Sequence, residues 1–552
     1  MSYIVNERKK TSRNGDYMTK LKEKIKGFSE IEKVKLNNKY IDNKLIELKD
    51  YFDNMYKMVD ENITLDLEQR IAILTDEDYN MIIAGAGSGK TTTITAKVKY
   101  LVDIKKINPN DIVIISFTNK AVEELKQRIN NDFKIDSLIT TFHKLGLMLL
   151  DNKNYKIIDN PYNIIKEYFD NELCNDKLLK VFNKQFKEYF KLPFFIIFFK
   201  NFNSYYNFIK KIKIFKIKPK DYYYKDFIYF CINIISKMKV KDYKFDDNDD
   251  FTNFINNLYN YYQVKLDENN YLDFEDIIIK ATNCLDIKKL KYKYIIVDEY
   301  QDISYQRFKL LKKLSDVCNA KVIVVGDDFQ SIYNFSGSDI NLFTDFSKIF
   351  GYGSVLKITN TYRNSQQLIS IAGNFVMKNK KQIKKQLISN KSLENPIEII
   401  LYNNFNYINR LNYCLKDIID KYGINQKILI LGRYKHDINK YLGDYFKLND
   451  NKIKSIKYSD LDITYLTVHS SKGLGFDQVI ILNCNNELYG FPSKIEDNKY
   501  IKLINSNNQV EEERRLFYVA LTRTKNKVYI LSNKSKQSEF IKEIKNYSIK
   551  LI

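Results

Sequence analysis

The 552-residue sequence contains no Trp, only three His, and six each of Cys and Pro. The cysteines are scattered and include no C-x-x-C pair, which argues against a disulfide framework and against zinc or iron–sulfur sites, and fits a reducing compartment. Its apolar runs are too short to span a bilayer, and no apolar stretch follows the first charges as in a signal peptide. We therefore expect a soluble, intracellular protein with no membrane partner.

Basic residues outnumber acidic ones by 90 to 68, giving a net charge of +22 that favours a polyanionic partner. Lys, Asn, Ile and Tyr are abundant throughout, and an AT-rich genome would raise all four without selection for binding. Residues 181–220 interleave Lys with Phe and Tyr. This pattern suits single-stranded nucleic acid, which offers phosphates and stackable bases, and it equally suits the core of a helical subdomain.

A glycine-rich turn directly follows the apolar run Met81 to Ile83. Such a turn points backbone N–H groups into one concavity, and the following helix adds the positive end of its dipole. Lys90 supplies a charge for the outer phosphates and Thr91 a hydroxyl for Mg²⁺. The sequence thus predicts a nucleoside triphosphate site, although the same turn could close an ordinary strand–helix unit. Its expected residues are Ala84, Gly85, Ala86, Gly87, Ser88, Gly89, Lys90, Thr91 and Thr92.

A second apolar run, Ile295 to Val297, leads into Asp298 and Glu299. Ligands of open parallel sheets bind at the carboxyl ends of strands, where this pair would lie. We expect Asp298 to hold Mg²⁺ and Glu299 to polarise the attacking water, as in an ATP hydrolase. A surface pair that merely ends a strand is the alternative.

Short β-branched runs alternate with helical stretches, which is typical of doubly wound parallel sheets. The fold class is therefore α/β, with two such sheets and a long helical insertion. We expect an N-terminal extension at 1–60, a P-loop domain at 61–150 and 271–345, the insertion at 151–270, and a second domain at 346–552. The runs lie at 112–115, 294–297, 322–325, 428–431, 465–468, 479–482 and 528–531.

Eight ordered segments resemble the motifs of superfamily 1 DNA helicases of the UvrD/Rep class, over about residues 60–540. Details such as Asp302-Ile303-Ser304 and Gly490-Phe491-Pro492-Ser493 resemble the DNA helicase IV branch. The segments are Gln69 with the glycine-rich turn, Phe117-Thr118-Asn119-Lys120-Ala121, Thr141-Phe142-His143, Val297 to Asp302, Gly326 to Tyr333, Thr361-Tyr362-Arg363, Thr467 to Leu474, and Glu511 to Arg523.

The resemblance implies two RecA-like domains, with an inserted subdomain called 1B. ATP and Mg²⁺ would be the cofactors. Gln69 would read adenine and Tyr362 would bind the nucleotide. Arg363 and Arg523 would close over the γ-phosphate, and Gln330 would sense it. The implied DNA contacts are Phe117, Thr118, Asn119, His143, Tyr333, Phe335 and His469; a core role is the alternative for either His, and a surface ion pair for either Arg taken alone.

Three departures from the family pattern stand out. Relatives insert a large subdomain, 2B, where this chain has only the short stretch 436–461. Gly475 stands where relatives usually carry a Glu that touches the ribose, so sugar selectivity would be weak. Because the chain has no Trp, Phe335 and Tyr333 must supply any stacking on DNA.

Three functions remain open from the sequence. The first is an ATP-driven 3′→5′ helicase or translocase on single-stranded or tailed DNA, acting as a monomer. The second is an ATPase that displaces proteins such as RNA polymerase without unwinding, with residues 1–60 as a contact arm. The third is a non-enzymatic scaffold, which the intact ATP-site residues disfavour. Repair or replication proteins are possible partners, in the cytoplasm or at a viral replication site.

Overall fold

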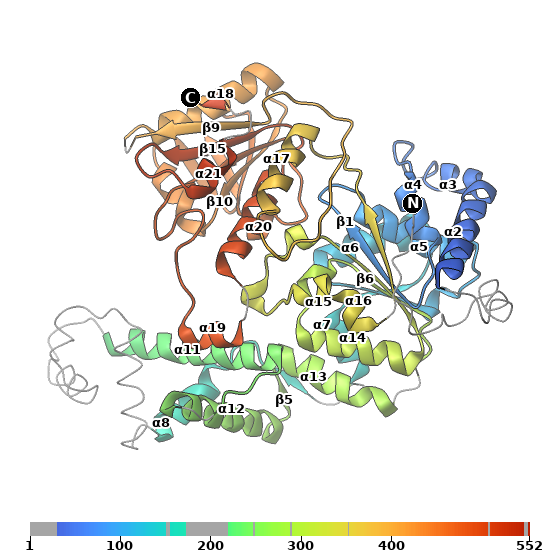
Figure 1. Cartoon of the computed structure of the whole chain (residues 1–552). Coiled ribbons are helices and arrows are strands. Elements are labelled where there is room, and N and C mark those ends of the chain that lie inside the picture. The colour runs from blue at the N-terminus through green and yellow to red at the C-terminus, as the bar shows by residue number, and fades with distance from the viewer. Residues whose placement is uncertain are drawn as a thin grey trace.

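The computed structural model describes residues 30–150, 155–172, 219–246, 249–287, 290–351, 353–403, 405–505, 508–545 and 550–551. It contains two large sheets and, below them, a helical body that includes a small two-stranded sheet (Figure 1). The predicted α/β class with parallel sheets is confirmed. None of the helices in these ranges has the length and apolar character needed to cross a membrane.

The first sheet has six parallel strands in the order β3-β2-β6-β7-β1-β8. Their side chains are almost all buried, because helices cover both faces, and such strands appear as continuous apolar runs. Alternate residues of β1 face opposite layers: Ile82 packs with one helical layer and Met81 and Ile83 with the other. The strands are β1 (Tyr79–Ala84), β2 (Ile112–Ser116), β3 (Leu138–Thr141), β6 (Tyr294–Val297), β7 (Lys321–Gly326) and β8 (Ser354–Ile358).

Two helical layers enclose this sheet (Figure 1). One contains α2 (Glu30–Glu47), α3 (Lys49–Asn54), α4 (Leu67–Leu74), α5 (Lys90–Asp103), α6 (Asn119–Lys126) and the π-helical turn η2 (Gln127–Asp132). The other contains α7 (Phe142–Leu149), α13 (Phe274–Cys284), α14 (Tyr305–Cys318), α15 (Asn341–Thr344) and α16 (Phe346–Phe350). Short 3₁₀ turns are η1 (Pro109–Asp111), η4 (Leu285–Ile287), η5 (Tyr300–Asp302), η6 (Asp328–Gln330) and η7 (Asn334–Ser336).

Two expected boundaries of the first domain need correction. Strand β8 pairs with β1, so it belongs to the first sheet, although the predicted boundary after residue 345 places it in the second domain. The described half of the expected extension 1–60 packs into the first core through Ile41, Phe52 and Tyr56. The Tyr56 hydroxyl also donates to the Thr92 carbonyl oxygen (2.8 Å), which ties this segment to the helix after the glycine-rich turn.

The insertion forms a separate helical body below the first sheet (Figure 1). It comprises β4 (Lys156–Ile157), α8 (Tyr162–Glu172), α11 (Pro219–Lys241), α12 (Asp250–Glu268) and β5 (Tyr271–Leu272). The described residues support the helical expectation for 151–270, whereas most of the basic and aromatic segment 181–220 lies outside them. Its core includes Tyr500 of α19 (Lys499–Ile504), whose ring centroid lies 4.3 Å from that of Phe251, so the second domain docks on this body.

The second sheet has eight strands in the order β11-β12-β13-β10-β14-β15-β9-β16. Residues 433–461 form η8 and the antiparallel hairpin β11–β12, which extends the sheet. Its elements are α17 (Gln366–Val376), β9 (Ile397–Tyr402), α18 (Tyr407–Tyr422), β10 (Lys427–Gly432), η8 (Lys435–Tyr441), β11 (Phe446–Asn449), β12 (Lys452–Ser455), β13 (Asp462–Thr467), η9 (His469–Ser471), β14 (Gln478–Ile481), α20 (Gln509–Leu521), β15 (Val528–Asn533), α21 (Glu539–Ile544) and β16 (Lys550–Leu551).

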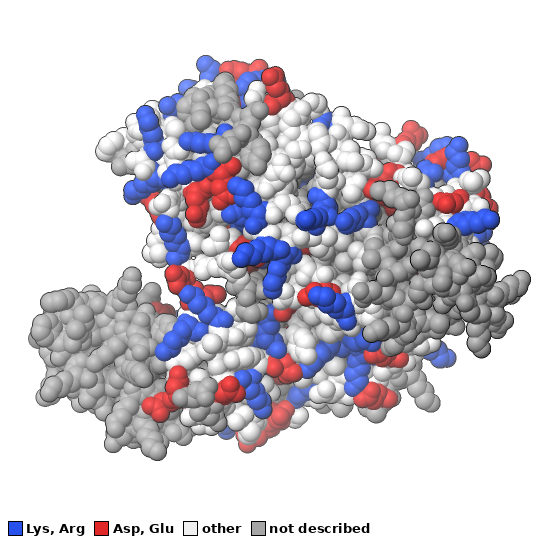
Figure 2. All heavy atoms as spheres, in the orientation of Figure 1, with Lys and Arg blue, Asp and Glu red and all other residues white. Residues whose placement is uncertain are grey.

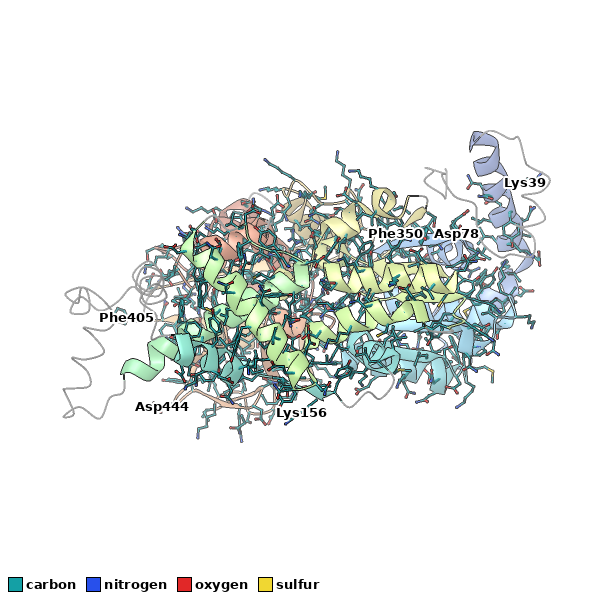
Figure 3. All side chains as sticks on the ribbon, turned by 90° about the horizontal axis from the view of Figure 1, so that it is seen from below. Lys39, Asp78, Lys156, Phe350, Phe405 and Asp444 are labelled. Carbon is teal, nitrogen blue, oxygen red and sulfur yellow. The ribbon has the colours of Figure 1, made fainter. Side chains whose placement is uncertain are left out.

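The view from below separates the two sheet-bearing ends of the molecule (Figure 3). Phe350 and Asp78 lie together near the end that carries α2, and the Phe350 ring packs on Tyr79 at 4.8 Å. Phe405 and Asp444, from the second domain, lie at the opposite end. The carboxyl ends of β1, β6 and β7 carry the glycine-rich turn, the Asp298–Glu299 pair and the segment that begins at Asp327.

Candidate nucleotide site and nucleic-acid interface

The glycine-rich turn joins β1 to α5 and faces the second domain closely. Gly87 and Gly89 adopt left-handed backbone angles, φ 72° and 80°, which other residues rarely adopt. A Cβ on Gly87 would lie 2.5 Å from the Arg363 Cβ, and one on Gly85 would lie 2.5 Å from a Leu387 methyl carbon. Glycine is therefore required here both for the turn and for the approach of the segment 361–391.

A cleft of about 440 Å³ lies between the turn and the second domain. It brings together most of the predicted nucleotide-site residues. Ala84 and Gln69 do not line it. The predicted residues that do are Gly85, Ala86, Gly87, Ser88, Gly89, Lys90, Thr91, Thr92, Asp298, Glu299, Gln330, Tyr362, Arg363 and Arg523.

Gln69 braces the glycine-rich turn from behind. Its Nε2 donates to the Ser88 carbonyl oxygen (3.1 Å), and its Oε1 accepts from the Asp66 N–H (3.0 Å) in the capping box that begins α4. Tyr362, half exposed at the cleft, donates its hydroxyl to the same Asp66 (2.7 Å). Contact between Gln69 and adenine stays a prediction.

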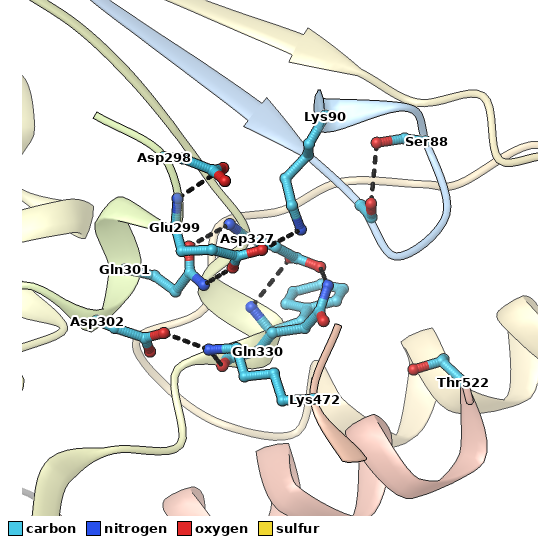
Figure 4. A network of polar contacts seen from close by, with 12 residues as sticks. Ser88, Lys90, Asp298, Glu299, Gln301, Asp302, Asp327, Gln330, Lys472 and Thr522 are labelled. Carbon is cyan, nitrogen blue, oxygen red and sulfur yellow. Dashed lines mark hydrogen bonds and ion pairs between the residues drawn. The ribbon is translucent and has the colours of Figure 1, made fainter. Parts of the chain in front are cut away.

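The two carboxylates after β6 differ in their surroundings (Figure 4). Lys90 Nζ lies 3.6 Å from Glu299 Oε1, and Gln301 Nε2 donates to Glu299 Oε2 at 2.5 Å. Burial opposes ionisation of Glu299, but Lys90 and Lys472 outweigh it and lower its pKa to about 2. Burial and the charge of Glu299 instead raise the pKa of Asp298 to about 7. Glu299 is thus the carboxylate that stays ionised in the protein alone.

Glu299 also has a left-handed backbone, φ 51°, which is unusual for a residue with a side chain. This conformation ends β6 sharply and begins η5, whose Gln301 holds the carboxylate. Backbone strain of this kind often accompanies functional sites, where surrounding contacts maintain it.

Two arginines from the second domain meet at one backbone oxygen. Arg363 Nη1 and Arg523 Nη1 each donate to the Leu474 carbonyl oxygen at 3.2 Å. Arg523 Nη2 also donates to Gln330 Oε1 (3.1 Å), which links it to the first domain. Arg523 is only 1% exposed, and burial together with the charge of Arg363 lowers its pKa to about 9. This convergence of positive charge suits an anionic ligand in the cleft.

Gly475, which stands where the family usually has Glu, lies against Arg363 of this arginine pair. A Cβ there would stand 3.3 Å from Arg363 Nε, so a larger residue would press on the guanidinium. The absence of a side chain at 475 is therefore compatible with the observed position of Arg363.

Several site residues were not predicted. Lys472 Nζ contacts Asp302 Oδ2 (2.5 Å) and donates to the Gln330 carbonyl oxygen (2.7 Å), so it crosses between the domains (Figure 4). Its place inside the motif Thr467 to Leu474 was the available signal. The cleft is also lined by Glu124, Arg128, Lys391 and Lys525, for which the sequence offered no distinct pattern.

Three predicted DNA-contacting residues form one aromatic group across the domain boundary. The ring centroids of Phe335 and His469 lie 5.3 Å apart, and those of Phe335 and Tyr333 lie 5.8 Å apart. The Tyr333 hydroxyl donates to the His469 carbonyl oxygen (3.3 Å). Phe335 is 57% exposed, which is unusual for an aromatic side chain held among others and suits stacking on a base.

His469 acts here as a neutral ring. Burial, with the nearby charges of Arg433 and Lys472, lowers its pKa to about 3. A contact from this residue to nucleic acid would therefore use its ring face or a neutral hydrogen bond, because the imidazolium is not present near pH 7.

The other predicted DNA contacts gather around β2 and α7. Phe117 packs on Phe142 (5.4 Å between centroids), and the Arg307 guanidinium carbon lies 5.6 Å from the Phe117 centroid. The His143 ring meets Phe274 at 5.5 Å, edge to face. Thr118 caps α6 and Asn119 begins it, both exposed. The structure brings Phe117 and His143 to one layer, separate from the contacts around Phe335.

Fold and cleft define the class: a P-loop nucleotide-binding protein of two α/β domains, with arginines from the second domain at the cleft. The comparisons with known proteins agree. The family model described as UvrD/REP helicase N-terminal domain matches residues 65–351, and that described as UvrD-like helicase C-terminal domain matches residues 442–535. The chain belongs to the UvrD/REP helicase family, and the predicted UvrD/Rep class and enzyme assignment are confirmed.

Curated relatives include a protein named DNA helicase IV from Escherichia coli K12, 27% identical over 94% of this chain and 75% of that protein. An ATP-dependent DNA helicase Rep from Buchnera aphidicola (subsp. Schizaphis graminum) is 30% identical over 62% of the chain and 48% of its own length. An ATP-dependent DNA helicase PcrA from Staphylococcus aureus is 29% identical over 58% of the chain. The chain therefore spans three quarters of the first relative, under half of Rep and 40% of PcrA.

Proposed function

We propose that this protein is an ATP-dependent DNA helicase or translocase that moves 3′→5′ along single-stranded DNA and hydrolyses ATP to ADP and phosphate. The observation that carries the proposal is the composition of the cleft. Lys90 and the Asp298–Glu299 pair come from the first domain, and Arg363 and Arg523 come from the second. The polarity rests on the family resemblance.

Hydrolysis at this cleft needs the γ-phosphate charge neutralised and one water activated. Thr91 and Asp298 both line the cleft and offer the oxygen ligands that Mg²⁺ prefers, so they would hold the ion. Bound Mg²⁺ supplies charge neutralisation on the phosphates. Glu299, kept ionised by Lys90 and oriented by Gln301, accepts a proton from the attacking water.

Nucleotide state would reach DNA through the segment that follows β7. Gln330 contacts Arg523, and three residues later Tyr333 bonds to the backbone of His469 in the second domain. ATP that draws the arginines toward the first domain would therefore shift the aromatic group around Phe335. Alternation of this group between two positions is a stepping movement along a bound strand.

Lys and Arg side chains occur across the middle of one molecular face, where the second domain approaches the bodies below it (Figure 2). The charge suits a phosphate backbone, whose binding weakens steeply with salt. The direct test uses strand displacement from duplexes with a 3′ or a 5′ single-stranded tail. Unwinding of the 3′-tailed substrate supports the proposal; preference for the 5′ tail contradicts the polarity, and ATP turnover without any strand displacement contradicts unwinding.

Replacement of the exposed aromatic, Phe335→Ala, is expected to weaken single-stranded DNA binding by about 1–3 kcal/mol, the usual range for a lost base stack. ATP affinity should hardly change, because Phe335 does not line the nucleotide cleft. Fluorescence anisotropy with a labelled oligonucleotide and binding of a fluorescent ATP analogue measure the two. Tyr305→Ala, another exposed aromatic, is the matched control. An equal loss of ATP binding in Phe335→Ala would instead indicate a core role.

We also expect a single protomer to unwind short 3′-tailed duplexes. In relatives the 2B insertion restrains a lone monomer, whereas residues 433–461 here form only η8 and the hairpin β11–β12. A single-turnover assay with protein below the DNA concentration measures unwinding by single protomers. In the same assay, unwinding should fall steeply as the salt concentration rises, because salt weakens binding to the phosphate backbone. Unwinding that appears only when several protomers load on each substrate would disprove monomer autonomy.

A further inference from the structure

A buried lysine outside every sequence motif contacts the chain where β7 leads into η6. Lys385 lies between α17 and β9, and its side chain is 1% exposed. Its Nζ contacts Asp327 Oδ1 (2.6 Å) and Asp328 Oδ1, whose side chains are fully buried. The ammonium also lies 3.7 Å from the Phe329 ring centroid, a cation–π contact between two buried side chains.

The segment that carries Lys385, residues 382–391, is a strap that crosses the nucleotide site. Ile388 exchanges backbone hydrogen bonds with Thr359 and Thr361, and Leu387 lies over Gly85 of the glycine-rich turn. Lys391 at the end of the strap lines the cleft. The strap therefore contacts the turn, the arginine segment 361–363 and the carboxylate pair after β7.

Asp327 and Asp328 have different further partners. Asp328 Oδ2 accepts from the strap itself, from Gln382 Nε2 (2.6 Å) and the Ile383 N–H (2.8 Å). Asp327 Oδ2 accepts from Gln330 Nε2 (2.7 Å), and the Asp327 N–H donates to Gln301 Oε1 (2.9 Å). Of these two aspartates, Asp327 is the one whose side-chain and backbone hydrogen bonds among the described residues reach the nucleotide site.

The orientation of the Gln330 amide depends on this carboxylate. Because Asp327 accepts from Nε2, the amide oxygen faces the other way, toward Arg523 Nη2 at 3.1 Å. A flipped amide would present its NH₂ group to the Arg523 guanidinium. Both groups are donors, so the hydrogen bond between Gln330 and Arg523 would be lost. Burial opposes both charges of the ion pair, yet Lys385 keeps the pKa of Asp327 low and the aspartates keep the pKa of Lys385 high.

We propose that Lys385 is a positioning residue for ATP hydrolysis: through Asp327 it fixes the amide of Gln330 and so holds the Arg523 guanidinium at the cleft. The inference rests on the hydrolysis proposed above. Lys385 touches neither the cleft nor the reacting atoms, so its loss should lower kcat while ATP binding stays intact. A displaced charge near the phosphate typically costs about 10²-fold in rate.

The decisive comparison uses two isosteric changes in equally buried partners of Lys385. In Asp327→Asn the new amide can donate to the Gln330 side-chain oxygen, which then turns away from Arg523 and no longer accepts from its guanidinium. The value of kcat should therefore fall at least tenfold, while binding of a fluorescent ATP analogue stays unchanged. Asp328→Asn leaves the contacts that join Lys385 to Arg523 through Asp327 and Gln330 unchanged. The value of kcat should therefore stay within about threefold of that of the unaltered protein. Equal effects of the two changes, or none from Asp327→Asn, would overturn the proposal.

A double-mutant cycle separates positioning from general destabilisation. Lys385→Met combined with Arg523→Ala should hydrolyse ATP no more slowly than Arg523→Ala alone, because both changes remove the same guanidinium contact. Losses that multiply in folded protein would show that Lys385 acts independently of Arg523. If Lys385→Met does not fold, the comparison of Asp327→Asn with Asp328→Asn still tests the positioning role of Lys385. Absence of ATP turnover in the unaltered protein would overturn the proposed function itself. That outcome is distinct from any difference between the variants and the unaltered protein.

Discussion

The variant Glu299→Gln should bind ATP nearly as well as the unaltered protein and turn it over about 10²–10⁴-fold more slowly, the usual cost of a lost catalytic base. The amide keeps the shape of the side chain and its proximity to Gln301, but it cannot accept a proton from water. Asp298, the expected Mg²⁺ ligand, is unchanged. Phosphate release under single- and multiple-turnover conditions measures the loss.

Glu543→Gln is the matched control for that experiment. Glu543, on α21, pairs with Arg514 of α20 (2.6 Å), and it does not line the nucleotide cleft. Its replacement removes the same charge at a comparable degree of burial and should leave turnover unchanged. Turnover of Glu299→Gln at the rate of the unaltered protein would disprove the assignment of this strand end as the catalytic site.

Arg523→Ala is expected to reduce kcat by about 10³-fold or more, the range found when a guanidinium that stabilises the transferring phosphate is removed. The fold should tolerate the change. Arg523 makes no salt bridge with an acidic residue among the described parts of the chain, and its strongest charged neighbour is the like-charged Arg363. Removing one of two adjacent buried positive charges relieves repulsion, which offsets the lost hydrogen bonds.

Arg410→Ala, on α18 of the second domain, serves as the control for Arg523→Ala, since Arg410 does not line the cleft. ATP affinity measured beside kcat separates binding from chemistry. A loss confined to affinity, with kcat retained at saturating ATP, would show that Arg523 only helps to hold the nucleotide and does not act on the reacting phosphate.

The buried parallel strands were the most predictable part of the fold. Runs such as 294–297 and 428–431 lie within β6 and β10, because strands covered on both faces are apolar throughout. Strands with polar positions were missed: β3 ends in two threonines, and β8 contains a lysine. β8 in particular shows no distinct pattern, and its pairing with β1 moved the domain boundary.

The nucleotide site was predictable where local sequence determines chemistry, as at Lys90, Thr91, Asp298 and Glu299, all of which line the cleft. Roles that depend on contacts between residues far apart in the sequence were not predictable. The hydrogen bond from Gln69 to the Ser88 carbonyl oxygen, which braces the turn, is one such contact; contact of Gln69 with adenine stays a prediction. Lys385 shows no motif at all, because its importance arises from aspartates far away in the sequence.

In the proposed function, ATP hydrolysis at the interdomain cleft drives movement along single-stranded DNA. The most direct measurement follows the arrival of the protein at a fluorophore on the 5′ end of oligonucleotides of increasing length, after mixing with ATP and Mg²⁺ in a stopped-flow instrument. Movement of this kind predicts an arrival time that lengthens in proportion to strand length, and ATP turnover that single-stranded DNA stimulates. Arrival independent of length, with turnover unaffected by DNA, would contradict it.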